Sequence, residues 1–248
     1  MRLNHGAPAT GCREKSEPSA FAKKRTGTSR HRFARGPTDP DQGWGAETSR
    51  ERTPITRIVL VQGHPDPGVR HFCHALADAY RSGAIAAGHG VRDVAVTDLQ
   101  FPVLRSRAEW ETQAPAPDVA RAQELIGWAE HIVLVYPLWL GTMPALLKAF
   151  LEQVFRPGFA MGNAGEGKGW SRKLAGKSAR IVVTMGMPAL VYRWYFGAHG
   201  LKSLEQGILA IVGIKPSRHS LVGSIEAISA RKRRGWLEAM RVLGHHAR

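Results

Sequence analysis

Hydrophobic residues along this chain gather into short runs that are separated by longer amphipathic stretches. The runs at 57–62, 131–135 and 179–184 are brief, β-branched and almost wholly apolar, which is typical of strands buried on both faces of a sheet. Residues 91–97 instead alternate valines with polar neighbours, as an edge strand does. A fifth strand is predicted around 215–222.

The stretches between these runs carry apolar residues at three- and four-residue spacing, which predicts helices. The predicted helices cover approximately residues 71–87, 118–130, 145–155, 202–209 and 224–243. Residues 99–117 and 157–176 are predicted to be loops. Strands that alternate with helices form a parallel sheet through right-handed crossovers. We therefore predict an α/β fold, a three-layer α/β/α sandwich around a five-stranded parallel sheet.

The most distinctive stretch, 136–144, reads Tyr-Pro-Leu-Trp-Leu-Gly-Thr-Met-Pro and lies between a predicted strand and a predicted helix. In an open parallel sheet such a loop lies at the carboxyl ends of the strands, where ligands bind. A loop so rich in apolar side chains is costly to leave in water, and it suits the wall of a pocket for a flat, partly apolar ligand. The alternative is that Trp139 and Leu140 simply cover the end of the sheet.

Composition divides the chain into two parts. Residues 1–53 contain one Leu and no Ile or Val, and they carry 11 basic and 6 acidic residues. Such a segment buries too little apolar surface to offset its ordering entropy, so we predict a disordered basic tail followed by one folded domain over 54–248.

The net charge of +15 suggests nucleic acid, an anionic membrane, a solvated basic surface or a phosphorylated cofactor as alternatives. Nucleic acid is disfavoured because no recognition helix, zinc or RNP pattern accompanies the charge, and the basic run 231–234 is typical of a solvated helix face. No segment predicts a membrane span or a secretory signal. Cys12 and Cys73 have no metal or redox spacing, so we predict no metal site and a cytoplasmic protein.

Three loops, at 63–70, 136–143 and 184–198, follow strands and are expected to converge on one edge of the sheet. The first precedes a helix N-terminus, whose free N–H groups favour anions, and His64, Arg70 and His71 add donors for a phosphate. A plain strand-to-helix turn is the alternative. Backbone amides around 138–140 are expected to face the polar edge of a fused ring, and the third loop offers the Thr184 hydroxyl and the Gly186 amide.

Together these motifs resemble the NAD(P)H:quinone oxidoreductases with a flavodoxin-like fold. The resemblance rests on Gly63-His64-Pro65-Asp66-Pro67, Tyr136-Pro137-Leu138-Trp139, Pro144-Ala145-Leu146-Leu147-Lys148 and Thr184-Met185-Gly186, and it extends over about 56–243. It implies the strand order 2-1-3-4-5, with FAD or FMN at the carboxyl edge of the sheet. It also implies hydride transfer from NAD(P)H to the flavin and then to a quinone or a related electrophile.

The resemblance also assigns roles to individual residues. It places His64, Phe72 and Cys73 beside the flavin phosphate or pyrophosphate. It places Pro137, Leu138, Trp139 and Leu140 along the isoalloxazine, and Thr184 and Gly186 near the polar edge of that ring. Tyr192 and His199 resemble the Tyr and His that sit over the flavin where nicotinamide and quinone bind in turn, which makes them the catalytic candidates. Relatives of this type are dimers, and the aromatic residues 192–196 suit such a contact.

The chain departs from the family in the first loop. The residues 68–71, Gly-Val-Arg-His, and Cys73 stand where the family usually offers a Ser or Thr hydroxyl and an Asn. Phosphate contacts would then come from backbone amides, Arg70 and His71, which leaves the choice between FMN and FAD open. The choice between NADH and NADPH and the acceptor also stay open. A flavin-binding ancillary subunit of a potassium efflux system, also found in this family, is the second hypothesis.

Overall fold

A computed structural model describes residues 54–162 and 171–248, so the predicted disorder of residues 1–53 concerns a segment outside the described residues. All strand pairings in the sheet are parallel, in the order β2-β1-β3-β4-β5. The strands are β1 (Arg57–Gln62), β2 (Gly90–Ala95), β3 (His131–Pro137), β4 (Ser178–Thr184) and β5 (Ser217–Val222). The predicted sandwich and strand order are confirmed.

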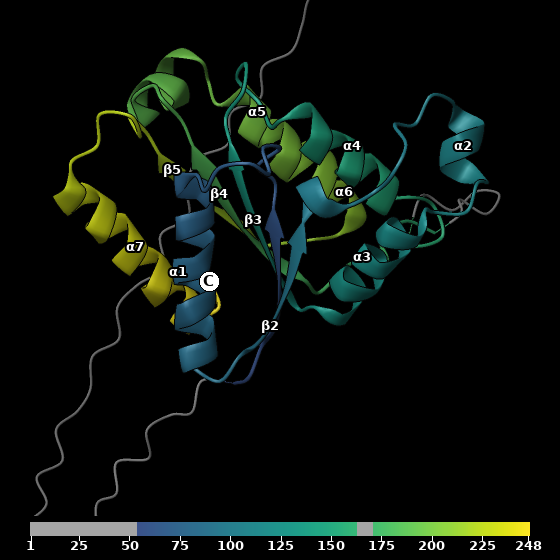
Figure 1. The fold of residues 1–248 in the computed structure, drawn as a ribbon. Coiled ribbons are helices and arrows are strands. Elements are labelled where there is room, and N and C mark those ends of the chain that lie inside the picture. The colour runs from purple at the N-terminus through teal and green to yellow at the C-terminus, as the bar shows by residue number, and fades with distance from the viewer. Residues whose placement is uncertain (1–53, 163–170) are drawn as a thin grey trace, which may run out of the picture. The chain divides into compact units, whose positions relative to one another are not determined.

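Helices cover both faces of this sheet (Figure 1). The helical segments are α1 (Phe72–Ala86), η1 (Val96–Asp98), α2 (Arg107–Glu111), α3 (Pro117–Trp128), α4 (Ala145–Val154), η2 (Val191–Tyr195), α5 (His199–Lys202), η3 (Ser203–Leu209), α6 (Ala210–Val212) and α7 (Ala230–His245). The helices α1 and α7 lie on one face, and α3, α4 and α6 lie on the other (Figure 1). None of the helices in the described ranges is long and apolar enough to cross a membrane.

The sheet is buried on both faces because its central strands are apolar at successive positions. Val59 and Val61 of β1 pack into the larger core cluster with α3 and α4, whereas Ile58 and Leu60 pack beneath α1. Alternate residues therefore serve opposite layers, as strand geometry requires. Both layers hold the carboxyl ends of the strands in fixed positions.

Several helices differ from the sequence prediction. The helix α2 lies in a segment that was predicted to be a loop, and it begins after Ser106, whose hydroxyl accepts a hydrogen bond from the Glu109 N–H at 3.1 Å. The predicted helix at 202–209 belongs to a longer helical stretch over 199–212. The helix α3 begins at Pro117 instead of at Asp118, whose carboxylate accepts from the Gln100 N–H at 2.7 Å.

The last helix begins later than predicted, at Ala230 with Ser229 as its N-cap. The preceding segment bonds to the loop after β4 instead: the Ser224 N–H donates to the Met187 carbonyl at 3.0 Å, and the Ile225 N–H donates to the Met185 carbonyl at 3.2 Å. Ser224 also has a φ of +55°, which is outside the α-helical region, so the helix does not include it.

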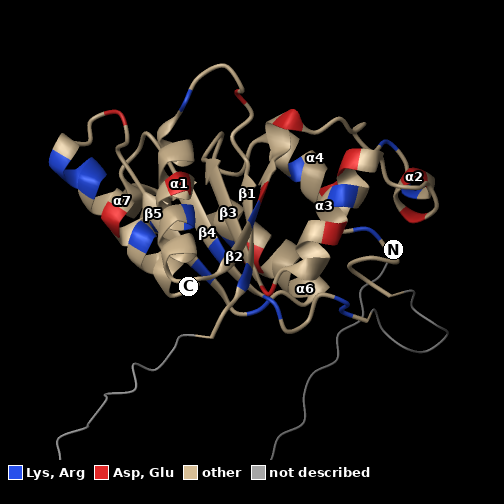
Figure 2. Ribbon diagram, turned by 60° about the horizontal axis from the view of Figure 1, so that its bottom comes forward, with Lys and Arg blue, Asp and Glu red and all other residues tan. Residues whose placement is uncertain are grey.

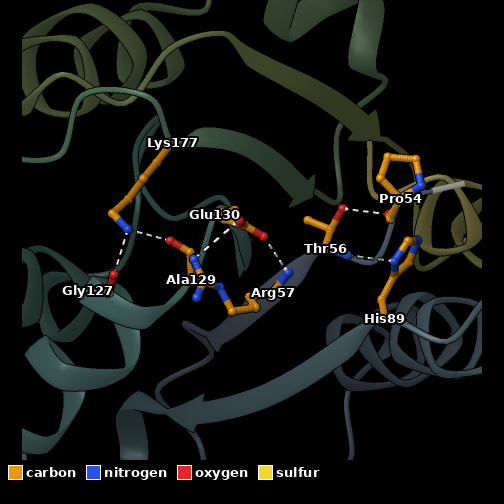
Figure 3. A network of polar contacts seen from close by, with 8 residues as sticks. All are labelled: Pro54, Thr56, Arg57, His89, Gly127, Ala129, Glu130 and Lys177. Carbon is orange, nitrogen blue, oxygen red and sulfur yellow. Dashed lines mark hydrogen bonds and ion pairs between the residues drawn. The ribbon is translucent and has the colours of Figure 1, made fainter.

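The opposite edge of the sheet, where the strands begin, is closed by polar contacts (Figure 3). Arg57 donates to Glu130 through its main-chain N–H, at 3.0 Å, and through its guanidinium, at 3.2 Å. The Thr56 N–H donates to His89 Nδ1 at 3.1 Å, and Lys177 Nζ bonds the carbonyls at the end of α3. These contacts fix the start of β1. Charged residues are spread over the outer faces of the helices, with several Lys and Arg along α7 (Figure 2).

Candidate functional site

Three loops that follow β1, β3 and β4 meet at the carboxyl edge of the sheet. The Leu138 N–H donates to the Thr184 carbonyl at 2.7 Å, which joins the second loop to the end of β4. Cys73 Sγ lies 2.9 Å from Thr184 Oγ1, which joins the start of α1 to the same strand. The His64 and Trp139 rings lie edge to face, with their centroids 6.4 Å apart. The predicted convergence of the loops is therefore present.

Asp66 organises the first loop. Its carboxylate accepts from the Gly68 N–H at 2.8 Å and pairs with His71 Nε2 at 2.8 Å, while the Asp66 N–H donates to His64 Nδ1 at 3.2 Å. These hydrogen bonds hold the pKa of the Asp66 carboxyl below its usual value. The sequence prediction missed this role, although an Asp between two prolines and before a glycine is the pattern of a side-chain-closed turn.

Three imidazoles gather at the N-terminus of α1. The rings of His64 and His71 stack with centroids 3.8 Å apart, and the His71 N–H donates to His74 Nδ1 at 3.0 Å. Burial, reinforced by the neighbouring His71 and His74, lowers the pKa of His64 to about 4. His64 is therefore neutral at pH 7. His74 was not predicted, and its spacing of one helical turn from His71 is the signal that identifies it.

Two other residues predicted for the phosphate lie along α1. The Arg70 guanidinium is exposed and pairs with the carboxylate of Asp78. The Phe72 ring lies beneath the guanidinium of Arg233 at 5.1 Å, so it contacts the basic start of α7. Their predicted contact with a phosphate stays a prediction.

The second loop ends in a tight turn that presents apolar side chains to solvent. The Trp139 N–H donates to the Thr142 carbonyl at 2.9 Å, and the Thr142 N–H returns the bond at 3.0 Å. The two residues between them, Leu140 and Gly141, have φ of +46° and +82°, the signature of a type I′ turn. Leu140 is fully exposed and Trp139 is 51% exposed. A strained, exposed leucine next to an exposed tryptophan is characteristic of a ligand-contacting site.

Tyr192 supports this turn from inside the protein. Its buried hydroxyl donates to the Gly141 carbonyl at 3.3 Å and accepts from the Leu201 N–H at 3.1 Å. Gly200 packs so closely that a Cβ there would lie 2.3 Å from the Gly141 carbonyl oxygen. Burial raises the pKa of the Tyr192 phenol. Its observed contacts position the turn, whereas His199 is exposed at the start of α5.

The hydrogen-bonding groups of the remaining predicted residues are largely committed within the protein. Thr184 is buried and its hydroxyl contacts Cys73, while burial raises the pKa of the Cys73 thiol to about 11, so the thiol stays protonated. The amides of Leu138 and Trp139, which were expected to face a ligand, bond within the protein. Gly186 is exposed, with Glu226 next to it. In the described part of the chain, no three His, Cys, Asp or Glu side chains are arranged to hold a metal ion.

An all-parallel sheet of order 2-1-3-4-5 whose carboxyl edge carries a helix N-terminus and an apolar turn defines the flavodoxin-like class of α/β proteins. The chain belongs to the family described as having a flavodoxin-like fold, which it matches over residues 56–242.

Curated proteins with similar sequences include two named as a dehydrogenase-like protein and an oxidoreductase. The chain is 32% identical over 186 residues to the ribosyldihydronicotinamide dehydrogenase-like protein traD of Penicillium crustosum, an alignment that covers 62% of this chain and 64% of that protein. It is 27% identical over 185 residues to an uncharacterized NAD(P)H oxidoreductase of Haemophilus influenzae, covering 73% of this chain and 90% of the relative. It is 42% identical over 77 residues to the potassium-efflux ancillary protein KefG of Escherichia coli, covering 31% of this chain and 39% of KefG.

Solved structures share the fold. Smu.1420 from Streptococcus mutans is similar with a TM-score of 0.62 and 26% identity, covering 76% of this chain and 98% of that one. The NAD(P)H:quinone oxidoreductase from Methanothermobacter marburgensis has a TM-score of 0.67 and 23% identity, covering 79% of this chain and all of its own. The second likeness is evidence for the fold alone.

Proposed function

We propose that this protein is an NAD(P)H-dependent flavoprotein that reduces quinones or related electrophiles by two electrons. The similarity to the dehydrogenase-like Penicillium protein and to the Haemophilus NAD(P)H oxidoreductase, together with the flavodoxin-like family, supports the class of reaction. The observation that carries the proposal is the type I′ turn at Leu140 and Gly141, which presents Trp139 and Leu140 to solvent beside the N-terminus of α1. An apolar platform next to an anion-binding helix end fits a ligand with a flat ring and a phosphate.

The residues at this edge fit a flavin. The N–H groups of Phe72 and Cys73 lie before the first helical acceptor of α1, so with His71 they would hold a phosphate. The side chains of Trp139 and Leu140 would cover one face of the ring and keep water from it, and Gly186 would let the ring edge approach the main chain. The chemistry that a bound flavin supplies is hydride acceptance from NAD(P)H followed by hydride donation to the acceptor, in ping-pong order.

The neutral state of His64 matters for this role. A neutral imidazole whose Nδ1 accepts from the Asp66 N–H carries its proton on Nε2, from which it donates a hydrogen bond toward the ligand. Asp66 holds the His71 ring in place. The His64–Asp66–His71 group would therefore bind and orient the ligand, and His64 requires no change in protonation at neutral pH.

The proposal is tested first by the visible absorbance spectrum of the purified protein and by comparison of its heat-released cofactor with FMN and FAD standards. A flavin spectrum that NADPH bleaches and menadione restores is expected. Replacement of Pro137–Leu140 by a Gly/Ser stretch should abolish flavin binding. The control Ile85→Ala, which changes an exposed apolar residue of α1 away from the loop, should leave flavin binding intact. Unchanged flavin binding in the loop variant would overturn the assignment.

A second candidate function is supported by the 42% identity to KefG, which covers 77 residues. We propose as the alternative that the chain binds flavin as an ancillary subunit of a potassium efflux system. Turnover of menadione with NAD(P)H distinguishes the two functions. Tight flavin binding without turnover, together with capture of a membrane transporter from solubilised membranes, would favour the ancillary role.

We also propose that the chain acts as a homodimer. Next to the third loop, η2 and its flanks expose large apolar side chains, namely Leu190, Trp194, Tyr195 and Phe196. A patch of this kind on a protein surface is usually covered by a partner. Light scattering after size-exclusion chromatography is expected to give the mass of a dimer, and Trp194→Glu should shift it to that of a monomer. A wild-type monomer at micromolar concentration would contradict the proposal.

A further inference from the structure

Two arginines lie side by side on the sheet face beneath α1, far along the strands from the three loops. Arg180 of β4 and Arg218 of β5 are direct cross-strand partners, and Arg180 is also paired in register with Val133 of β3. Arg180 is only 6% exposed. Neither arginine takes part in any ion pair found within the described residues, 54–162 and 171–248. Like charges placed directly opposite each other destabilise a sheet, and burial increases the cost.

The hydrogen bonds of the Arg180 guanidinium are poor. Its Nη1 reaches the His219 carbonyl at 3.4 Å and Ser220 Oγ at 3.5 Å, at the outer limit for such bonds, and its buried Nε has no partner in the described structure. A buried charge is normally paired or fully hydrogen-bonded. Arg180 is neither.

Two more buried polar atoms on this face lack partners. The Tyr80 hydroxyl and His131 Nε2 form no hydrogen bond with described groups, and the two rings lie nearly parallel with centroids 6.4 Å apart. His131 Nδ1 lies 2.7 Å from Ser178 Oγ. When that hydroxyl donates to Nδ1, the ring proton is on Nε2, which then becomes a donor. We call Tyr80, His131, Arg180 and Arg218 the α1-face cluster.

We propose that the α1-face cluster binds a small inorganic anion, of which chloride is the representative. The cluster holds two guanidinium charges and no carboxylate, so the missing component is a negative charge. Its orphaned groups are single N–H and O–H donors that come from α1, β3 and β4, so a one-atom acceptor suits them. A water molecule accepts hydrogen bonds from two donors but leaves the buried Arg180 charge uncompensated. The site is independent of the flavin edge and of the proposed activity.

The experiment measures thermal unfolding of the full chain in sodium chloride and in sodium gluconate at equal ionic strength, with any bound cofactor kept at the same level. Chloride is expected to raise Tm by about 5 °C over gluconate when it is present at a hundred times its dissociation constant. Arg180→Met should remove this difference. The matched control is Arg231→Met, an exposed arginine of α7, which should retain it.

Two other variants cover the case in which Arg180→Met does not fold. Tyr80→Phe removes only a hydroxyl, and Arg218→Gln changes an exposed residue, and each should reduce the chloride-specific shift. Crystals soaked in bromide should show anomalous density between Tyr80 and Arg180. The same chloride shift in Tyr80→Phe, Arg218→Gln and wild type, a water molecule alone at the cluster, or stabilisation by phosphate but not by chloride would overturn the proposal.

Discussion

Leu140 is placed where neither its backbone nor its side chain is favourable in the free protein. Its φ of +46° costs a non-glycine residue about 1–2 kcal/mol, and its side chain is fully exposed. Leu140→Gly should therefore raise the free energy of unfolding of the cofactor-free protein by roughly 0.5–1 kcal/mol, since glycine relieves the strain but loses more chain entropy. The same change should weaken flavin binding about tenfold. Urea denaturation measures the change in stability, and flavin titration measures the change in affinity.

Gly141 provides the control for that prediction, because it shares the turn and has no side chain to cover a ligand. Gly141→Ala should destabilise the cofactor-free protein, since its φ of +82° favours glycine. If Leu140→Gly lowered stability, the backbone at Leu140 would not be strained, and if it left flavin affinity unchanged, Leu140 would have no role in covering a ligand.

His64 makes stability depend on pH. The imidazole takes up a proton near pH 6.5 in the unfolded chain, but in the folded protein burial and its neighbouring imidazoles lower its pKa to about 4. The unfolded state therefore binds more protons between pH 6.5 and 4, so His64 should remove up to about 3 kcal/mol of stability as the pH falls through this range. His64→Gln should flatten the urea stability profile there. His246→Gln, at an exposed position, should not, and equal profiles for the two variants would refute the assignment.

At the scale of elements, Tyr192 fastens the η2–α5 segment to the second loop. Tyr192→Phe leaves the Leu201 N–H and the Gly141 carbonyl without their partner, so we expect a loss of about 1–2 kcal/mol in the free energy of unfolding and weaker flavin binding. Tyr195→Phe, at a position 80% exposed, should change stability by less than about 0.5 kcal/mol. A Tyr192→Phe protein with wild-type stability and flavin affinity but lost turnover would show instead that the phenol is catalytic.

The crossing of α1 and α7 depends on two glycines. A Cβ at Gly83 would lie 2.0 Å from the Arg241 carbonyl oxygen, and one at Gly244 would lie 2.0 Å from the Tyr80 carbonyl oxygen. Gly244→Ala should therefore destabilise the protein by about 2–3 kcal/mol, because two backbones must move apart. Gly235→Ala, within the same helix but facing open space, should stabilise it by about 0.5–1 kcal/mol. Chemical denaturation of both variants tests the packing, and equal effects would contradict it.

The elements that could be predicted from sequence are those whose own residues determine their secondary structure. The strands β1, β3 and β4 are continuous apolar runs, and β2 alternates as an edge strand does. The start of α7 could not be predicted, because Ser224 has a left-handed backbone conformation in a segment that bonds to the loop after β4, nearly forty positions earlier. The five residues of α2 are too few for periodicity to identify.

The candidate site was predictable as a location but not in its internal contacts. Three loops after three strands had to converge once the sheet was parallel, and the apolar stretch at 137–140 marked the edge. The strand order came from the family resemblance and not from periodicity. Which polar groups remain available to a ligand could not be predicted, since the Tyr192 hydroxyl bonds to the Gly141 carbonyl and the Thr184 hydroxyl contacts Cys73. Such pairings join residues that are distant in sequence.

At the scale of the whole molecule, the N-terminal boundary of the domain proposed for residues 54–248 is set by the contacts that hold the start of β1. Thr56 bonds to the turn after α1 through His89 and Gly90, and Arg57 bonds to Glu130 at the start of β3 (Figure 3). A chain that begins at Pro54 keeps all these contacts. It should match the full chain in circular dichroism, flavin stoichiometry and Tm to within about 2 °C.

A chain that begins at Ile58 is the matched comparison, because it is only four residues shorter than the one that begins at Pro54. It loses the Arg57 pairing with Glu130 and both main-chain bonds of Thr56, so the buried strand β1 begins without a fixed end. The five lost hydrogen bonds, at about 0.5–1 kcal/mol each, predict a decrease of roughly 2–5 kcal/mol in the free energy of unfolding. Urea denaturation of the two truncated chains measures the difference. Equal stabilities of the two truncated chains would mean that the polar contacts of Thr56 and Arg57 do not stabilise the domain. A chain that begins at Pro54 and is less stable than the full chain would mean that the domain begins earlier in the chain.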